Sequence, residues 1–123
     1  MRFVPAAALS LLLAACAATT LPVTDGRIET EDQFLATVAG RTITNDLARF
    51  EIDEGGAFAG ISDGQRVAGT WDFRDGFWCR AITSPVDLPE ECQVWEVRGD
   101  LLIITRDRGR GPSLRFALPG AGI

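Results

Sequence analysis

The chain has 123 residues, room for one domain, and its 46% hydrophobic and 24% charged residues are typical of a globular protein. All 12 basic residues are arginines and there is no histidine, so the chain lacks an imidazole for acid–base catalysis and a lysine for a Schiff base. The net charge of −5 argues against a general nucleic-acid-binding protein, which normally carries a basic surface. We therefore expect no nucleic-acid partner.

Residues 1–15 have the layout of a bacterial signal peptide. Arg2 supplies a positive start, residues 3–13 are almost continuously apolar, and small residues follow, in a stretch too short to span a membrane. The sequence Leu13-Ala14-Ala15-Cys16 then resembles the bacterial lipobox. The resemblance implies cleavage before Cys16 and acyl chains on that cysteine that hold the protein at a membrane. Ala17 is not the aspartate that retains many such lipoproteins at the inner membrane, which favours the periplasmic face of the outer membrane.

An ordinary signal peptide with an incidental cysteine is the alternative to a lipobox. The cysteine count bears on this choice, because three cysteines in an exported protein would leave one unpaired. If Cys16 carries lipid, Cys79 and Cys92 remain, and an oxidising compartment lets them form a disulfide. A metal site is the alternative for these two thiols, but without histidine it would be short of ligands, so we expect no metal.

A lipidated tether and one helix are predicted next along the chain. Residues 16–29 are small and polar and include Pro22 and Gly26, which is typical of a linker. The sequence from Thr30 to Gln33 fits a capping box, and Gly40 is a stop signal, so we predict a helix over about 31–39. Its apolar stripe is Phe34, Leu35 and Val38.

The remaining sequence predicts an antiparallel meander. Asp63-Gly64, Asp75-Gly76 and Gly99-Asp100 are two-residue hairpin signals, and residues 54–56 suit a three-residue loop. These turns separate predicted strands near 47–53, 57–62, 65–73, 77–83, 91–98, 101–106 and 113–118.

The register that these turns impose places one set of apolar residues on a common face. Four hairpins chosen by turn chemistry alone agree on this face, which also suits the alternating residues of the last strand. The predicted core comprises Phe50, Ile52, Phe58, Val67, Trp71, Phe73, Trp78, Ile82, Trp95, Val97, Leu102, Ile104, Leu114, Phe116 and Leu118.

The opposite face also carries apolar side chains and predicts a cover. If Cys79 faces Cys92, these two share the outer side with Val94, Leu101 and Ile103, and the helix over 31–39 is the expected cover. The predicted fold class is therefore all-β. We expect an up-and-down meander of seven or eight strands over residues 30–120, forming a small barrel or half-barrel with one short N-terminal helix on it or across an end.

Two groups of residues could form a site. Arg106, Arg108, Arg110 and Arg115 flank a glycine-rich loop that could hold an anion or a partner, although a solvated connection is the commoner meaning of such a loop. Trp71, Trp78 and Trp95 could line a ligand pocket, although residues on a core face more often serve packing. Arg80 faces Trp71 in the predicted register and could stack on its ring. No catalytic constellation and no cofactor motif stands out from these residues.

The stretch from Phe34 to Phe116 resembles a group of small exported bacterial proteins of unestablished role. The resemblance is carried by Gly69-Thr70-Trp71, by the run from Asp75 to Arg80, by Cys92-Gln93-Val94 and by the run from Arg106 to Gly111. Proteins of this kind sometimes carry the label dihydrodipicolinate reductase, an enzyme class that needs a glycine-rich dinucleotide fold and histidine or lysine chemistry. The Gly-Thr-Trp…Cys…Cys pattern is also similar to periplasmic protease inhibitors built on small lipidated barrels.

The expected function is that of a non-enzymatic module, anchored by lipid on Cys16, that binds a protein or another envelope component. Two alternatives stay open: a lipocalin-like carrier of a small apolar ligand, and a periplasmic protease inhibitor. An enzyme is the least favoured class, because the groups that usually carry general-base chemistry are missing or uncommitted.

Overall fold

Antiparallel strands joined by short turns make up most of this protein. The structure is a computed structural model that describes residues 2–3 and 19–119, so all but two residues of the predicted signal peptide, and Cys16, lie outside the described residues. The elements in chain order are β1 (Asp25–Arg27), α1 (Glu31–Thr37), β2 (Thr42–Thr44), β3 (Ala48–Ile52), β4 (Ala57–Ser62), β5 (Gln65–Arg74), β6 (Phe77–Ser84), β7 (Leu88–Arg98), β8 (Leu101–Thr105), α2 (Arg106–Gly109) and β9 (Ser113–Ala117).

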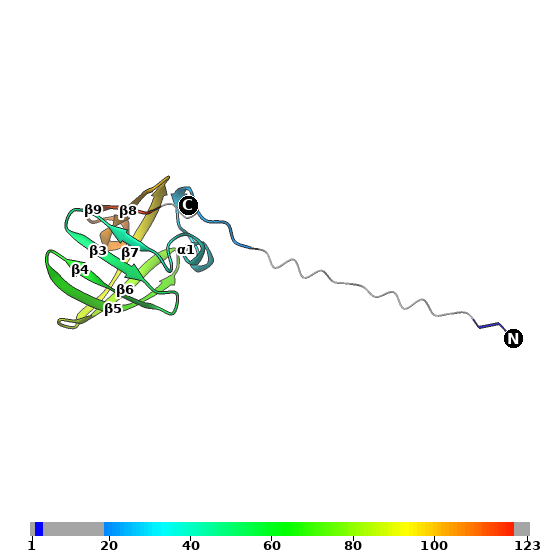
Figure 1. Ribbon diagram of the computed structural model, residues 1–123, viewed down its shortest axis with the longest axis horizontal. Coiled ribbons are helices and arrows are strands. Elements are labelled where there is room, and N and C mark those ends of the chain that lie inside the picture. Colours follow the sequence, from blue (N-terminus) through cyan, green and yellow to red (C-terminus); the bar gives the residue numbers. More distant parts are fainter. Residues whose placement is uncertain (1, 4–18, 120–123) are drawn as a thin grey trace.

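The strands β2 to β9 close into an eight-stranded barrel, which confirms the predicted all-β fold (Figure 1). Each of these strands pairs antiparallel with the next along the chain, and β9 returns to β2. The closing seam is short: it has one registered pair, Thr44 with Ala117, and a hydrogen bond of 3.1 Å from Asn45 Nδ2 to the carbonyl of Arg115.

The hairpin registers agree with those that the turn residues predict. Phe73 faces Trp78 across the Asp75-Gly76 turn, and Trp95 faces Ile104 across Gly99-Asp100. In the Asp75-Gly76 turn both residues have positive φ, 53° and 82°, the backbone of a type I′ hairpin, which glycine and aspartate tolerate. This local chemistry explains why the register could be read from the sequence.

Two glycines on the barrel wall hold aromatic rings in place. Gly60 faces Phe50 and Gly69 faces Phe58 in neighbouring strands. A Cβ at Gly69 would lie 2.7 Å from the Phe58 ring, and one at Gly60 would lie 2.7 Å from the Phe50 ring. Each ring therefore packs over a glycine of the next strand, and a larger residue at either glycine would displace it.

The folded part of the chain begins before residue 30. Strand β1 pairs with the end of β7, from Asp25 with Arg98 to Arg27 with Glu96. Ile28 is fully buried and its amide donates to the carbonyl of Trp95 at 2.9 Å. Part of the segment predicted as a tether over 16–29 is thus integrated into the barrel, because it completes the hydrogen bonding of β7 beyond the start of β6.

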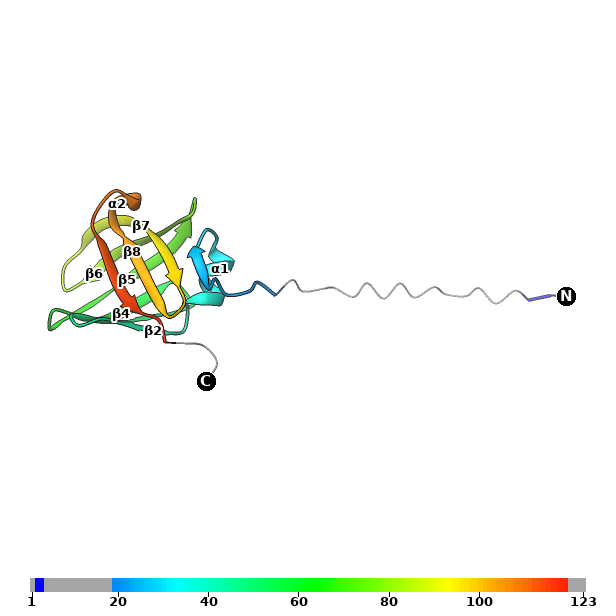
Figure 2. The same ribbon diagram turned by 90° about the horizontal axis from the view of Figure 1, so that it is seen from above.

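Helix α1 closes one end of the barrel. Thr30 caps it as predicted, since its Oγ1 accepts from the amide of Gln33 at 3.1 Å. Phe34 is 0% exposed, and its ring lies 4.7 Å from that of Trp71 and 5.3 Å from that of Trp95, centroid to centroid. Figure 2 shows α1 at the end from which the N-terminal segment leaves, with α2 at a distance from it. We call this end, filled by Phe34 and its aromatic neighbours, the closed end.

The expectation that the helix covers the outer apolar face was wrong. Helix α1 buries Phe34 and Val38 inside the barrel end, where aromatic surface is larger, and leaves Leu35 36% exposed. On the outer face Val94 is covered by α2 instead, since a Cβ at Gly109 would lie 3.0 Å from a Val94 methyl. Leu101 and Ile103 stay half-buried on that face.

Candidate functional site

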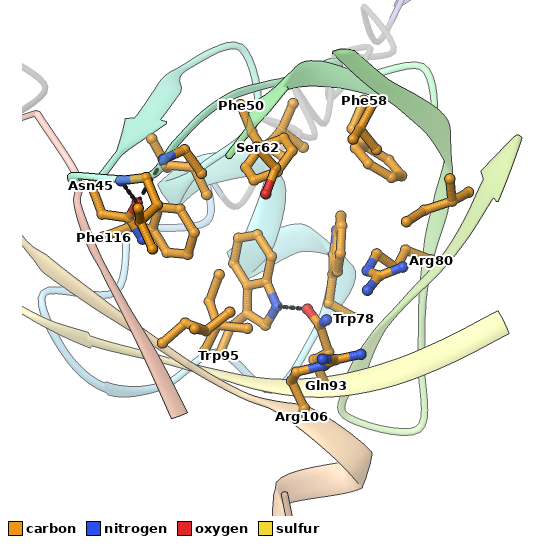
Figure 3. Close-up of a pocket in the computed structure, with 18 residues that line it drawn as sticks. Asn45, Phe50, Phe58, Ser62, Trp78, Arg80, Gln93, Trp95, Arg106 and Phe116 are labelled. Atoms are coloured by element: carbon orange, nitrogen blue, oxygen red, sulfur yellow. Dashed lines mark hydrogen bonds between the residues drawn. The ribbon is translucent and has the colours of Figure 1, made fainter. Parts of the chain in front are cut away.

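The end of the barrel opposite α1 holds a cavity of about 280 Å³ (Figure 3). We call this the open end. Its apolar wall consists of inward-facing residues of the strands, which include the aromatic side chains Phe50, Phe58, Trp78, Trp95 and Phe116. Leu47 and Leu114, which also line it, are 69% and 44% exposed. The cavity is therefore bordered by apolar residues that reach solvent.

One side of the cavity is polar. Arg80, Gln93 and Arg106 lie together on this side, across from Phe116 and Asn45 (Figure 3). Arg80 belongs to β6 and Gln93 to β7, and each is two residues from an inward-facing tryptophan of its own strand, so both point into the barrel.

Hydrogen bonds join this polar side into a chain. The indole nitrogen of Trp95 donates to Gln93 Oε1 at 3.0 Å, and Gln93 Nε2 donates to Glu91 Oε1 at 2.8 Å. Arg106 then binds both oxygens of Glu91, with Nε at 2.9 and 3.0 Å. The hydrogen bonds from Arg106 hold the pKa of the Glu91 carboxyl below its usual value, against a smaller opposing effect of burial. Glu91 is thus a fixed anion with its acceptor capacity largely used.

Arg80 is the least satisfied charge of this cluster. Its side chain is 17% exposed, and its Nη2 lies 3.9 Å from Glu91 Oε1, beyond hydrogen-bond distance. The Arg80 guanidinium donates no hydrogen bond to any residue within the described part of the chain. Burial lowers the pKa of the Arg80 guanidinium, which Glu91 partly offsets and Arg106 reinforces. A cation with open donors therefore lies in the cavity wall.

Trp78 brings a second unsatisfied donor to the same wall. It is 3% exposed, and its indole N–H is buried without an acceptor among the described residues. A buried donor left unpaired costs about 1–3 kcal/mol, so native proteins seldom retain one.

The three predicted tryptophans divide between packing and cavity. Trp71 packs at the closed end, where its N–H donates to the carbonyls of Asp53 and Ala57 at 2.9 and 3.1 Å, and it does not line the cavity. Trp78 and Trp95 are buried in the core and also line the cavity. Arg80 does not stack on Trp71 as its register suggested; its guanidinium turns towards Glu91 instead.

The four arginines of the predicted anion loop are not brought together. Arg106 turns inward to Glu91, while Arg108 lies outside, 5.5 Å from the centroid of the Phe77 ring. Arg110 pairs with Asp107 at 3.7 Å, and Arg115 belongs to β9, opposite Ile103 of the outer face. Asp107 and Arg108 both have positive φ, which turns the loop sharply and separates these side chains.

Cys79 and Cys92 form a disulfide between β6 and β7, as the sequence predicted. They are directly paired residues, with Cα atoms 4.0 Å apart, on the outer side of the wall that carries Arg80 and Gln93 inside. Glu90 lies next to them, and the three side chains are of types that can bind a metal ion. Metals bind thiolates, however, and the two cysteine sulfurs are joined to each other, so they are not available as ligands.

Sequence reasoning missed the polar side of the cavity, although one signal for it existed. The predicted register places Arg80 opposite Trp71, which puts an arginine on the core face. A buried charge needs a partner, and Glu91 is the residue paired with Arg80 on the next strand.

Comparisons with known proteins do not identify the chain: no protein-family model, no curated protein and no solved structure matches it. Among the described residues, no helix is long and apolar enough to span a membrane.

Proposed function

We propose that this protein is a non-enzymatic, lipid-anchored binding protein of the cell envelope whose barrel carries a small, largely apolar ligand in its open end. The observation that carries the proposal is the contrast between the ends of one barrel. Phe34 is fully buried at the closed end, whereas the side chains that line the open end enclose a cavity of about 280 Å³. Protein interiors are close-packed, so a retained apolar cavity that reaches solvent favours an occupant.

The alternatives draw less support from the geometry. A module that binds a protein partner would need an exposed docking surface. Leu47 and Leu114 are exposed but belong to the cavity border, whereas Ile61, Val86 and Leu88 are exposed outside it. A protease inhibitor would present a loop or terminus to an active site, and none of the side-chain contacts described above favours that role. A carrier function therefore accounts best for the cavity and for its apolar border.

The anchoring part of the proposal rests on the lipobox sequence that ends at Cys16. In that region the amide of Val23 donates to Thr37 Oγ1 at 2.8 Å beside α1, which ties this part of the chain to the closed end. Seven residues of chain reach at most about 25 Å when fully extended. A lipid on Cys16 would therefore hold the closed end near the membrane and leave the open end directed away from it, towards soluble ligands.

Titration of a water-soluble form with octan-1-ol tests the carrier function. The chain beginning at residue 17 retains every described element, and Trp78 and Trp95 in the cavity wall report on binding by fluorescence. We expect a saturable change in tryptophan emission and, by calorimetry, a negative heat-capacity change, because apolar surface is buried.

A matched pair of substitutions locates the binding site. Ala48 lines the cavity, whereas Ala59 is exposed on β4, so Ala48→Phe fills the site and Ala59→Phe adds the same group outside. The first variant is expected to lose binding and the second to keep it. Absence of saturable binding by the unsubstituted protein, or equal binding by both variants, would refute the proposal.

A further inference from the structure

The open end contains an arginine that the fold has buried without giving it a full set of partners. Arg80 faces the interior of the barrel from β6, and Figure 3 shows its guanidinium beside Trp78 within the ring of strands. Its ion pair within the described residues is with Glu91, where Arg80 Nη2 lies 3.9 Å from Oε1. Glu91 already accepts hydrogen bonds from Arg106 and Gln93. Its planar set of N–H donors suits a carboxylate or another planar anion.

The charges around the cavity do not balance. The guanidinium groups of Arg80 and Arg106 border it. Among the described residues, Glu91 is the one carboxylate paired with either arginine, so these three side chains together carry one excess positive charge. Burying an uncompensated charge is costly, and a ligand with one negative charge would neutralise it. A ligand with two negative charges would exceed the balance and bury a new excess charge.

The apolar wall and the volume define the rest of the ligand. A space of about 280 Å³ lies near the lower end of the range of roughly 300–1,000 Å³ that is typical of small-molecule pockets, so the ligand must be small. The rings of Phe50, Phe58 and Phe116 line this space, so most of the ligand must be apolar. The buried N–H of Trp78, two residues from Arg80 on the same face of β6, offers an additional donor.

We propose that the ligand of the open end is a small amphipathic monocarboxylate, with its carboxylate on the Arg80 guanidinium and its apolar body against the aromatic wall. The proposal deepens, and rests on, the carrier function proposed above. Glu91 and Arg106 act as positioning residues: their ion pair occupies the carboxylate that would otherwise neutralise Arg80, and so keeps Arg80 free for the ligand.

Calorimetric titration with three ligands of one chain length tests the proposal, using the chain that begins at residue 17. The ligands are octanoate, octan-1-ol and octyl phosphate at pH 7.5, which carry one, no and close to two negative charges. A hydrogen-bonded charge contributes about 1.5–3 kcal/mol, so octanoate should bind roughly 10-fold to 100-fold more tightly than octan-1-ol. Octyl phosphate should bind more weakly than octanoate.

Two arginine variants locate the charge. Arg80→Met keeps most of the apolar length of the side chain and removes its charge, while Arg49→Met does the same at an exposed position of β3. Arg80→Met should reduce octanoate affinity to that of octan-1-ol and leave octan-1-ol affinity within about twofold, because the buried apolar area is unchanged. Arg49→Met should change neither.

A third variant keeps the test decisive if Arg80→Met does not fold. Glu91→Gln removes the negative charge beside both arginines, so it raises the excess positive charge by one and should improve octyl phosphate binding relative to octanoate.

The outcomes separate the two proposals. Equal affinities for octanoate and octan-1-ol would overturn the monocarboxylate proposal and leave the carrier function standing, whereas binding of neither ligand would overturn both. Tighter binding of octyl phosphate than of octanoate by the unsubstituted protein would assign the site to a dianion instead.

Discussion

The two ends of this barrel are built from the same strands and differ in what fills them. At the closed end Phe34 enters from α1 and packs against the rings of Trp71 and Trp95, and the N–H of Trp71 has two acceptors. At the open end, within the described residues, the indole N–H of Trp78 has no acceptor and the guanidinium of Arg80 donates no hydrogen bond. The closed end is therefore packed with partnered side chains, while the donors without partners lie at the open end, so we expect the closed end to contribute more to stability.

Removing the Phe34 ring from the closed end should have the largest effect on stability. Phe34→Ala takes a fully buried ring out of an aromatic cluster and should lower the free energy of unfolding by about 3–5 kcal/mol. Phe50→Ala removes the same group at the open end, where the ring is half-buried and already borders a cavity, and should cost clearly less. Urea unfolding followed by circular dichroism measures both, and equal losses would contradict the division between the ends.

The disulfide should stabilise both ends together. It closes a loop with a sequence separation of 13, which in the chain-entropy model contributes about 3 kcal/mol. The double variant Cys79→Ser with Cys92→Ser should therefore lower the melting temperature. Because the bridge lies on the outer wall, octan-1-ol affinity of the variant measured well below its melting temperature should be retained. Loss of binding in a fully folded variant would show that the bridge shapes the cavity.

Breaking the hydrogen-bonded chain of the polar wall should cost less. Gln93→Ala leaves the buried N–H of Trp95 without its acceptor and removes one donor from Glu91, a loss of about 1–3 kcal/mol in unfolding free energy. Gln65→Ala, at an exposed position of β5, is the matched control and should change stability by less than about 0.5 kcal/mol. If Gln93→Ala leaves the free energy of unfolding unchanged, these hydrogen bonds orient the side chains of the polar wall without stabilising the fold.

Acid should weaken the polar wall through Glu91. Its pKa is lower in the folded protein than in the unfolded chain, so its contribution to stability is fully present above the unfolded value of about 4.3 and is lost as the pH falls through the folded pKa. We expect the difference in unfolding free energy between the unsubstituted protein and Glu91→Gln to be constant near neutral pH and to shrink below about pH 4.3. A difference that stays constant down to pH 3 would contradict the assignment of this ion pair as a stabilising contact.

The sequence by itself determined four hairpins, their register and the face that forms the core, but not the strands β1 and β2. Asp75-Gly76 fixes the pairing of Phe73 with Trp78, and the parity of side chains along a strand then places Trp71 inside and Cys79 outside. These relations depend on neighbouring residues and on backbone dihedrals, so they can be predicted without knowledge of the whole fold. The disulfide between Cys79 and Cys92 was predicted from the cysteine count, with Cys16 assigned to lipid, and the parity of side chains is consistent with it.

Only the tertiary structure decided where the helix lies, how the chain before it joins the sheet, and where the cavity is. Phe34 reaches the barrel interior because strand closure creates an end to be filled, and the pairing of β1 depends on where β6 leaves β7. The separation of Arg106 from Arg108 depends on a sharp turn in α2, and the hollow at the open end depends on the positions of all eight strands at once. Local turn chemistry sets which residues face each other, but the volume enclosed by a closed sheet is a property of the whole set of strands.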